Sequence, residues 1–221
     1  MTAGPTKLRA MIGDYPITAA LKRGNVTSTQ VGFDFADVKV PNTAFKRVVR
    51  DLEFDVAELA IVTFLMAKAH GKPLALLPAV LVGRFQHPFI VYNAARGVLG
   101  PRELNGKRVG IRSYSVTTVT WIRGILANDY GANLDSIKWV TFEDAHVAEF
   151  RDPPGVERAA EGKDLLAMLR AGEIDAAVLG APADDPQIRT LFPDPTAAAR
   201  VWQTKNQATQ INHMVVVKNT L

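Results

Sequence analysis

Apolar residues follow two alternating periodicities along the whole chain. Short runs rich in β-branched and aromatic residues, several with period-2 alternation, predict strands at 7–12, 30–40, 54–57, 74–82, 89–93, 108–111, 137–142, 174–179 and 214–217. Helical spacing with flanking cap and stop residues predicts helices at 16–23, 42–52, 60–70, 116–130 and 162–171. A Pro- and Asp-rich stretch at 181–195 is expected to surround a short helical piece. Strands and helices that alternate in this way are typical of α/β proteins, in which helices cover a mostly parallel sheet.

A short internal repeat bears on the number of lobes. Segments 50–57 (RDLEFDVA) and 170–177 (RAGEIDAA) share Arg, Glu, Asp and the final Ala, and each leads from a helix through an acidic turn into a buried strand. Chance similarity is one explanation, and a shared topology of two lobes is the other. Because residues 96–106 shift to Gly, Pro and charge, a boundary is expected there. We predict one lobe from 1–93 with 211–221 and another from 94–210, joined by crossovers near 90 and 213 and closing on a ligand about a hinge.

Composition narrows the class of ligand. The 221 residues include 26 basic and 22 acidic side chains and no cysteine. The charges are dispersed, so a nucleic-acid partner is not expected, whereas the small positive excess suits a small anionic ligand. Without cysteine, neither disulfides nor thiolate metal sites are available. No run resembles a signal peptide or a membrane span, so the chain as written is expected to be cytoplasmic with no membrane partner. Its oligomeric state stays open.

Several segments resemble a known family. LNGKRVGI at 104–111 is typical of the opening of the second lobe in the type 2 periplasmic-binding-protein fold. More specific segments are GRFQHPF at 83–89, GIRSYSVTT at 110–118, WVTFEDAH at 139–146 and INHM at 211–214. Together they resemble the 4,5-dihydroxyphthalate decarboxylase family over essentially the whole chain. The resemblance implies an α/β, two-lobed, periplasmic-binding-protein-like clamp, each lobe a mostly parallel sheet flanked by helices. Members of this family continue beyond the last strand, so the chain is expected to be truncated and its first lobe incomplete.

The resemblance also implies a reaction. A carboxy-lyase of this family would convert 4,5-dihydroxyphthalate, or a closely related aromatic acid, to protocatechuate in the inter-lobe cleft. Each carboxyl group lies para to a hydroxyl, so loss of a phenolic proton moves electron density to the carbon that carries the carboxylate. The protein must hold both carboxylates, accept the phenolic proton and deliver a proton to carbon. The sequence contains neither a P-loop motif nor the motif Gly-x-Gly-x-x-Gly. No cofactor is expected.

Residues 112–118 are the candidate carboxylate-binding segment. Arg112 follows a predicted strand, and Ser113, Thr117 and Thr118 lead into a helix. Ligands of open α/β sheets bind beyond the carboxyl ends of strands, and amides at a helix start favour anions. Arg suits bidentate contact with carboxylates, so we expect Arg112 to bind one carboxylate and Arg84 the other. The alternative is an ordinary helix cap beside a surface arginine, which leaves the run of hydroxyls unexplained.

Histidines are the candidates for proton transfer. His87 and His146 are expected to form an acid/base pair, because imidazole titrates near neutral pH. His87 could instead be a satisfied structural residue. Glu143 has Glu-x-x-His spacing with His146, but no second such motif occurs, so it is expected to contact substrate and not a metal.

Three further residues are placed near the substrate of the first lobe. Glu58 follows the strand at 54–57 and enters an apolar helix, where a lone carboxylate either faces the cleft or is solvated. Asp14 and Tyr15 occupy the first-lobe corner equivalent to 112–118, where Asp14 could be a helix cap. Either Glu58 or Asp14 is expected to contact the catechol hydroxyls. His213 is expected to contact substrate or to lie at the hinge.

Three other functions share this fold. A solute-binding protein that delivers an aromatic carboxylate to a transporter would have the same cleft. The absence of an export signal from the sequence counts against this function. A ligand-sensing regulator needs a DNA-binding helix-turn-helix, for which the strand beginning at Lys7 leaves no room. An enzyme acting on another small acid stays open.

Overall fold

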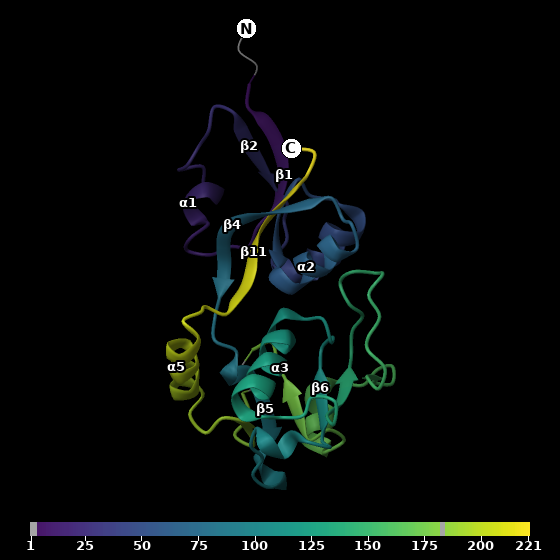
Figure 1. Ribbon diagram of the computed structural model, residues 1–221. Helices are drawn as coiled ribbons and strands as arrows, with labels where there is room; N and C mark the ends of the chain where they lie inside the picture. The colour runs from purple at the N-terminus through teal and green to yellow at the C-terminus, as the bar shows by residue number, and fades with distance from the viewer. Residues whose placement is uncertain (1–3, 182–183) are drawn as a thin grey trace. The chain divides into compact units, whose positions relative to one another are not determined.

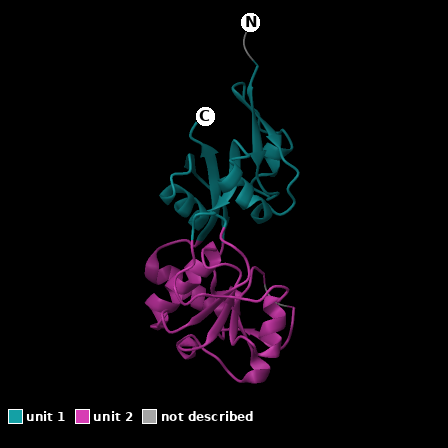
Figure 2. Ribbon diagram, turned by 90° about the vertical axis from the view of Figure 1, so that its right-hand side faces the viewer, with its two compact units in different colours: residues 1–83, 146–150, 211–221 teal, residues 84–145, 151–210 magenta. Residues whose placement is uncertain are grey.

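The computed structural model describes residues 4–181 and 184–221 and divides the chain into two compact units. Unit 1 comprises residues 1–83, 146–150 and 211–221, and unit 2 comprises residues 84–145 and 151–210 (Figure 2). Each unit has its own sheet with flanking helices, which confirms the predicted α/β class (Figure 1). Both sheets contain antiparallel as well as the predicted parallel strand pairs.

Unit 1 is built on a five-stranded sheet in the order β2-β1-β3-β11-β4. The strands are β1 (Thr6–Met11), β2 (Val31–Phe35), β3 (Val56–Ala60), β4 (Leu74–Gly83) and β11 (Ile211–Lys218). β1 is parallel to β2 and β3, whereas β11 is antiparallel to β3 and β4. Its helices are α1 (Ala19–Lys22), the 3-10 turn η1 (Pro41–Ala44), the π-helical turn η2 (Arg47–Asp51) and α2 (Ile61–Ala69). All five residues of β3 are buried, because the strand lies in the middle of the sheet.

Unit 2 is built on a six-stranded sheet in the order β10-β5-β9-β6-β7-β8. The strands are β5 (Ile90–Asn93), β6 (Arg108–Ile111), β7 (Lys138–Thr141), β8 (Glu157–Arg158), β9 (Ala176–Val178) and β10 (Ile188–Thr190). The order β9-β6-β7-β8 is parallel throughout, and β5 and β10 add antiparallel pairs. The helices are η3 (His87–Phe89), η4 (Ala94–Arg96), η5 (Arg102–Leu104), α3 (Thr117–Tyr130), α4 (Leu165–Ala171) and α5 (Pro195–Asn206).

The internal repeat makes the same two hydrogen bonds in both units. The Asp55 carboxylate accepts the backbone N–H of Arg9 at 2.9 Å, and the Asp55 N–H donates to the Arg9 carbonyl at 2.8 Å. Asp175 makes the same two bonds with Arg108, at 2.9 and 2.8 Å. The strands that follow occupy equivalent places, since β2-β1-β3-β11 in unit 1 corresponds to β7-β6-β9-β5 in unit 2. These strands share one topology, which confirms that the repeat reflects a topology common to the two lobes.

The observed boundary differs from the sequence expectation of 93/94. β5 pairs with β9 and β10 and therefore belongs to unit 2, so the chain passes between units at Gly83 and Arg84. Residues 146–150 belong to unit 1 although they lie within the predicted second lobe, because Val147 and Phe150 pack into the core around Phe45.

Two local predictions also differ from the structure, and one helix was not predicted. The helix expected at 42–52 is two short turns, the second ending at Leu52 in a left-handed conformation with φ 49°. In the described part of the stretch 181–195, which excludes residues 182 and 183, the regular element is strand β10 and not a helical piece. Helix α5 was not predicted; it begins where the Asp194 side chain accepts the Ala197 N–H at 2.9 Å.

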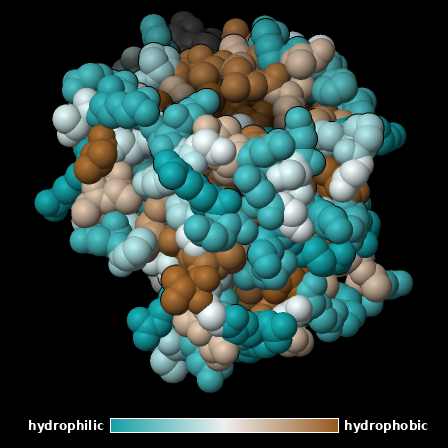
Figure 3. Space-filling model, turned by 60° about the horizontal axis from the view of Figure 1, so that its bottom comes forward, coloured by the Kyte–Doolittle hydropathy of each residue, from teal (hydrophilic) through white to brown (hydrophobic). Residues whose placement is uncertain are grey.

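Hydrophilic side chains cover most of the face drawn in Figure 3, and apolar side chains form separate patches on it. Within 4–181 and 184–221, no helix has both the length and the apolar character needed to cross a bilayer.

Candidate functional site

Glu58 is the centre of a buried hydrogen-bond network in unit 1. Its side chain, in the central strand β3, is 0% exposed. Oε1 accepts the Tyr15 hydroxyl at 2.7 Å and lies 2.6 Å from Nδ1 of His213, and Oε2 accepts the backbone N–H of Gly13 at 2.9 Å. A buried carboxylate is costly unless its oxygens are hydrogen-bonded, and these three groups bond both of them. The network joins the corner after β1 to β3 and β11, so the structure brings together Glu58, Tyr15 and His213 of the predicted set.

Tyr15 stays protonated in this network. Burial raises its pKa well above the usual value of a phenol, and the hydrogen bond to Glu58 raises it further. The phenol therefore acts as a hydrogen-bond donor to the carboxylate near neutral pH.

Phe45 links the second histidine of unit 1 to this network. Its ring meets His213 at 5.1 Å and His146 at 5.5 Å between centroids, with interplanar angles of 85° and 87°. Such edge-to-face contacts are favoured between aromatic rings. His146 Nδ1 lies 2.8 Å from the Thr63 hydroxyl, and the His146 carbonyl accepts the Arg50 Nε–H at 2.8 Å. His146 is therefore held by unit 1 and is 7% exposed.

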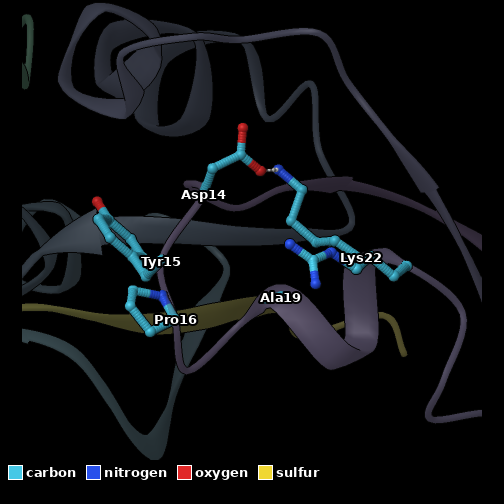
Figure 4. A pocket seen from close by; sticks show the side chains of 6 residues that line it. Asp14, Tyr15, Pro16, Ala19 and Lys22 are labelled. Atoms are coloured by element: carbon cyan, nitrogen blue, oxygen red, sulfur yellow. Dashed lines mark ion pairs between the residues drawn. The ribbon is translucent and has the colours of Figure 1, made fainter.

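The corner after β1 also borders a pocket of about 740 Å³. It is lined by Asp14, Tyr15, Pro16, Ala19, Lys22 and Arg23 (Figure 4). Asp14 forms an ion pair with Lys22, which lowers the pKa of the Asp14 carboxyl, and Lys22 also donates to the Ile12 carbonyl at 2.9 Å. In Figure 4 the Tyr15 hydroxyl points away from this pair. Asp14 is thus a surface ion-pair residue and caps no helix, since the N-cap of α1 is Thr18.

The corner after β6 in unit 2 collects five predicted residues. Ser113, Thr117 and Thr118 are buried there, and the Ser113 hydroxyl lies 3.3 Å from that of Ser115. Arg112 Nε is 3.4 Å from the Glu143 carboxylate, and the Glu143 N–H donates to the Arg112 carbonyl at 2.7 Å. The N-cap position of α3 is Val116, which contributes no side-chain cap. A guanidinium, several hydroxyls and a helix start at the carboxyl ends of β6 and β7 form an arrangement that can bind a carboxylate.

Arg84 and His87 lie together at the start of unit 2. The Arg84 guanidinium stacks 4.0 Å from the Phe89 ring centroid and donates to the Gly180 carbonyl at 3.2 Å, and burial lowers its pKa. His87 is 1% exposed and packs against Phe192, with ring centroids 5.1 Å apart. Neither of its ring nitrogens has a hydrogen-bond partner among the described residues. Burial lowers the His87 pKa to about 4, so this imidazole is neutral at pH 7.

Sequence reasoning missed three contributors to the unit 1 network. Gly13 appears in the sequence only as a turn residue, although its amide binds Glu58. Thr63 was detectable as the hydroxyl within the apolar helix 60–70, and Phe45 carried no signal beyond its apolar side chain. Backbone amides and edge-on rings have no sequence signature of their own.

Two solved structures with a similar fold are solute-binding proteins. The alkanesulfonate-binding protein SsuA from Xanthomonas axonopodis pv. citri is 14% identical, with a TM-score of 0.60 over 99% of this chain and 68% of that chain. The aliphatic sulphonate-binding protein SsuA from Escherichia coli is 14% identical, with a TM-score of 0.61 over 98% of this chain and 66% of that chain. At such identities the likeness shows the fold alone, a periplasmic-binding-protein-like α/β fold.

Curated relatives are closer in sequence. No family model matches the chain. A 4,5-dihydroxyphthalate decarboxylase of Comamonas testosteroni is 31% identical over 97% of this chain and 69% of its own length. One of Pseudomonas putida is 30% identical over 88% of this chain and 80% of its own length. Similarity of this extent, together with the fold, places the chain in the 4,5-dihydroxyphthalate decarboxylase family.

Proposed function

We propose that this chain is a carboxy-lyase that decarboxylates 4,5-dihydroxyphthalate, or a closely related aromatic acid, to protocatechuate or the corresponding product. The observation that carries the proposal is the 31% identity to the Comamonas testosteroni decarboxylase, which extends over 97% of this chain. Proton-handling side chains in unit 1 and an anion-binding corner in unit 2 match the two requirements of the reaction.

The reaction needs stabilisation of the negative charge that develops on the substrate, and it needs two proton transfers. Loss of a phenolic proton raises electron density at the ring carbon para to it, which carries a carboxylate. Protonation of that carbon forms a C–H bond and a keto-like intermediate. The bond to the carboxylate then breaks, its electron pair restores the aromatic ring, and carbon dioxide leaves. Hydrogen-bond donors aimed at the charges stabilise the intermediate without further reorganisation.

The carboxylates are assigned to unit 2. Arg112 would form the charge-assisted bonds, with Ser113, Thr117 and Thr118 around it and Glu143 orienting the guanidinium through their 3.4 Å contact. Arg84 is proposed for the second carboxylate. Its stacking on Phe89 fixes the guanidinium plane, and its lowered pKa reflects a desolvated position in which an anion would bind more strongly.

The phenolic hydroxyls are assigned to Asp14 and the protons to the histidines of the chain, whereas Glu58 is fully buried and would act through the Tyr15 and His213 side chains that it binds. His87 and His146 are the acid/base pair expected from the sequence. The enclosure of His87 and its pKa of about 4 suit it poorly to proton donation at neutral pH, whereas His146 Nδ1 lies 2.8 Å from the Thr63 hydroxyl, which holds the ring. Asp14 lies in the pocket lined by Tyr15 and Lys22 and would accept from a hydroxyl there.

The direct test is incubation of the protein with 4,5-dihydroxyphthalate, with chromatography of the ring product and measurement of released carbon dioxide. Phthalate is the matched control substrate, because it has both carboxylates but no para hydroxyl and should not react. Turnover of the dihydroxy acid alone supports the proposal. Saturable binding without turnover would instead support a solute-binding protein, the alternative that the SsuA-like fold also permits.

A further inference from the structure

The structure defines different roles for the two ring nitrogens of His213. Nδ1 lies 2.6 Å from Glu58 Oε1, and its ring meets Phe45 edge-on at 5.1 Å. No described residue contacts Nε2 through a hydrogen bond, and the side chain is 20% exposed. A carboxylate can only accept, so the bond to Glu58 requires a proton on Nδ1. In the neutral ring Nε2 is then the basic atom, and in the protonated ring it carries the proton that can leave.

Glu58 is itself held in one orientation. The amide of Gly13 donates to Oε2 at 2.9 Å, and the Tyr15 hydroxyl donates to Oε1 at 2.7 Å beside His213. The carboxylate is fully buried, so water does not compete for these oxygens. A buried carboxylate that orients an imidazole is the arrangement by which hydrolases keep a histidine in the reactive tautomer. Gly13, Tyr15, Glu58 and His213 all belong to unit 1 and are joined there by these hydrogen bonds.

The contacts of two other histidines differ from those of His213. His87 has no hydrogen-bond partner among the described residues for either nitrogen and is enclosed, whereas His146 Nδ1 lies 2.8 Å from the Thr63 hydroxyl, a group that can donate or accept. His70 is exposed at the end of α2.

We propose that His213 is the general acid of the decarboxylation and that Glu58 and Tyr15 are its positioning residues; this inference rests on the proposed function. The protonated imidazole gives its Nε2 proton to the ring carbon, where a C–H bond forms. The C–C bond to the carboxylate breaks, its electrons return to the ring, and carbon dioxide leaves. Neutral His213, protonated on Nδ1 towards Glu58, is recharged at Nε2 by a proton from solvent or from the phenol.

The structure gives a sharp expectation for Glu58→Gln. The Gly13 amide can only donate, so the Gln oxygen must face it, and the Gln NH₂ then faces Tyr15 and His213. Neutral His213 must accept from that NH₂ at Nδ1 and carry its proton on Nε2. Long-range proton–nitrogen NMR of the full chain, at a pH where His213 is neutral, should show the Nδ1–H tautomer in the wild type and the Nε2–H tautomer in Glu58→Gln. An Nε2–H tautomer in the wild type would overturn the inference.

Kinetics provide the second test. His213→Ala should lower kcat by about 10²–10⁴-fold with a smaller change in KM, the usual contribution of a general acid, and added imidazole should restore part of the rate. A purely structural histidine would show no such rescue. Glu58→Gln should lower kcat without rescue by imidazole, and His70→Ala is the matched control that should keep wild-type activity. An active wild type with an equally active His213→Ala would overturn the acid role alone, whereas an inactive wild type would overturn the proposed function and the acid role with it.

Discussion

Replacement of Glu58 by Ala should be among the most destabilising single changes in unit 1. It leaves three donors without their acceptor: the Gly13 amide, the Tyr15 hydroxyl and His213 Nδ1. Each buried donor that loses its partner costs about 1–2 kcal/mol, so the expected loss is about 3–6 kcal/mol, with the lower end applying if water enters the space. That is a large part of the about 5–15 kcal/mol by which native proteins are stable.

The assay is urea unfolding followed in two ways. Far-UV circular dichroism reports both units, whereas tryptophan fluorescence reports unit 2, which contains all three tryptophans, Trp121, Trp139 and Trp202. We expect Glu58→Ala to lower the urea midpoint of the circular dichroism signal more than that of fluorescence. The matched control is Glu149→Ala, which removes a half-exposed carboxylate paired with Lys72 at 2.6 Å and should cost about 0–1 kcal/mol. Equal midpoints for the two variants would refute the reasoning.

Four further changes have defined outcomes. His87 has a folded pKa of about 4, below its unfolded value of 6.5, so its contribution to stability is present above pH 6.5 and is lost as pH falls towards 4; His87→Leu should remove about 2 kcal/mol of the destabilisation seen in urea between pH 7 and 5. Gly110→Ala should lower stability by about 1–3 kcal/mol, since its Cβ would lie 2.5 Å from Ile174 Cδ1. Gly124→Ala in α3, with open space around the new methyl, should raise the melting temperature instead, because Ala is favoured over Gly within a helix by about 0.5–1 kcal/mol. Arg112→Gln should raise KM for 4,5-dihydroxyphthalate by at least about tenfold in steady-state assays, because the neutral amide loses a charge-assisted bond; an unchanged KM would remove Arg112 from the carboxylate site.

Hydrophobic patterning was sufficient to predict the α/β class and most strands, because strand and helix periods differ strongly in this chain. The repeat at 50–57 and 170–177 was informative for a reason visible only in the structure. Asp55 and Asp175 satisfy equivalent backbone groups at the start of equivalent strands. The assignment of β5 to unit 2 was not predictable from local pattern, since the partners of a strand lie far away in sequence. Likewise, residues 146–150 join unit 1 through the packing of Val147 and Phe150, which no local signal indicates.

The types of residue in the sequence predicted which residues belong to the candidate site better than they predicted which of these residues contact one another. Glu58, Tyr15 and His213 were singled out separately, and their mutual bonds came from sheet register, which places β11 beside β3 with Val215 opposite Glu58. Asp14 was expected at a catechol hydroxyl or a helix cap, but its proximity to Lys22 makes it an ion-pair partner. The burial of His87 depends on packing against Phe192, more than a hundred residues away in sequence, so the sequence could not distinguish a catalytic from a structural imidazole.

The origin of the hydrogen on the product ring tests the central claim most directly. The chain should convert 4,5-dihydroxyphthalate in D₂O to protocatechuate with one deuterium at the ring carbon that lost its carboxylate, and release one equivalent of carbon dioxide. Proton NMR and mass spectrometry of the product measure both position and number. Unchanged dihydroxyphthalate after incubation with folded protein, or a product without deuterium at that carbon, would contradict decarboxylation by proton delivery to the ring.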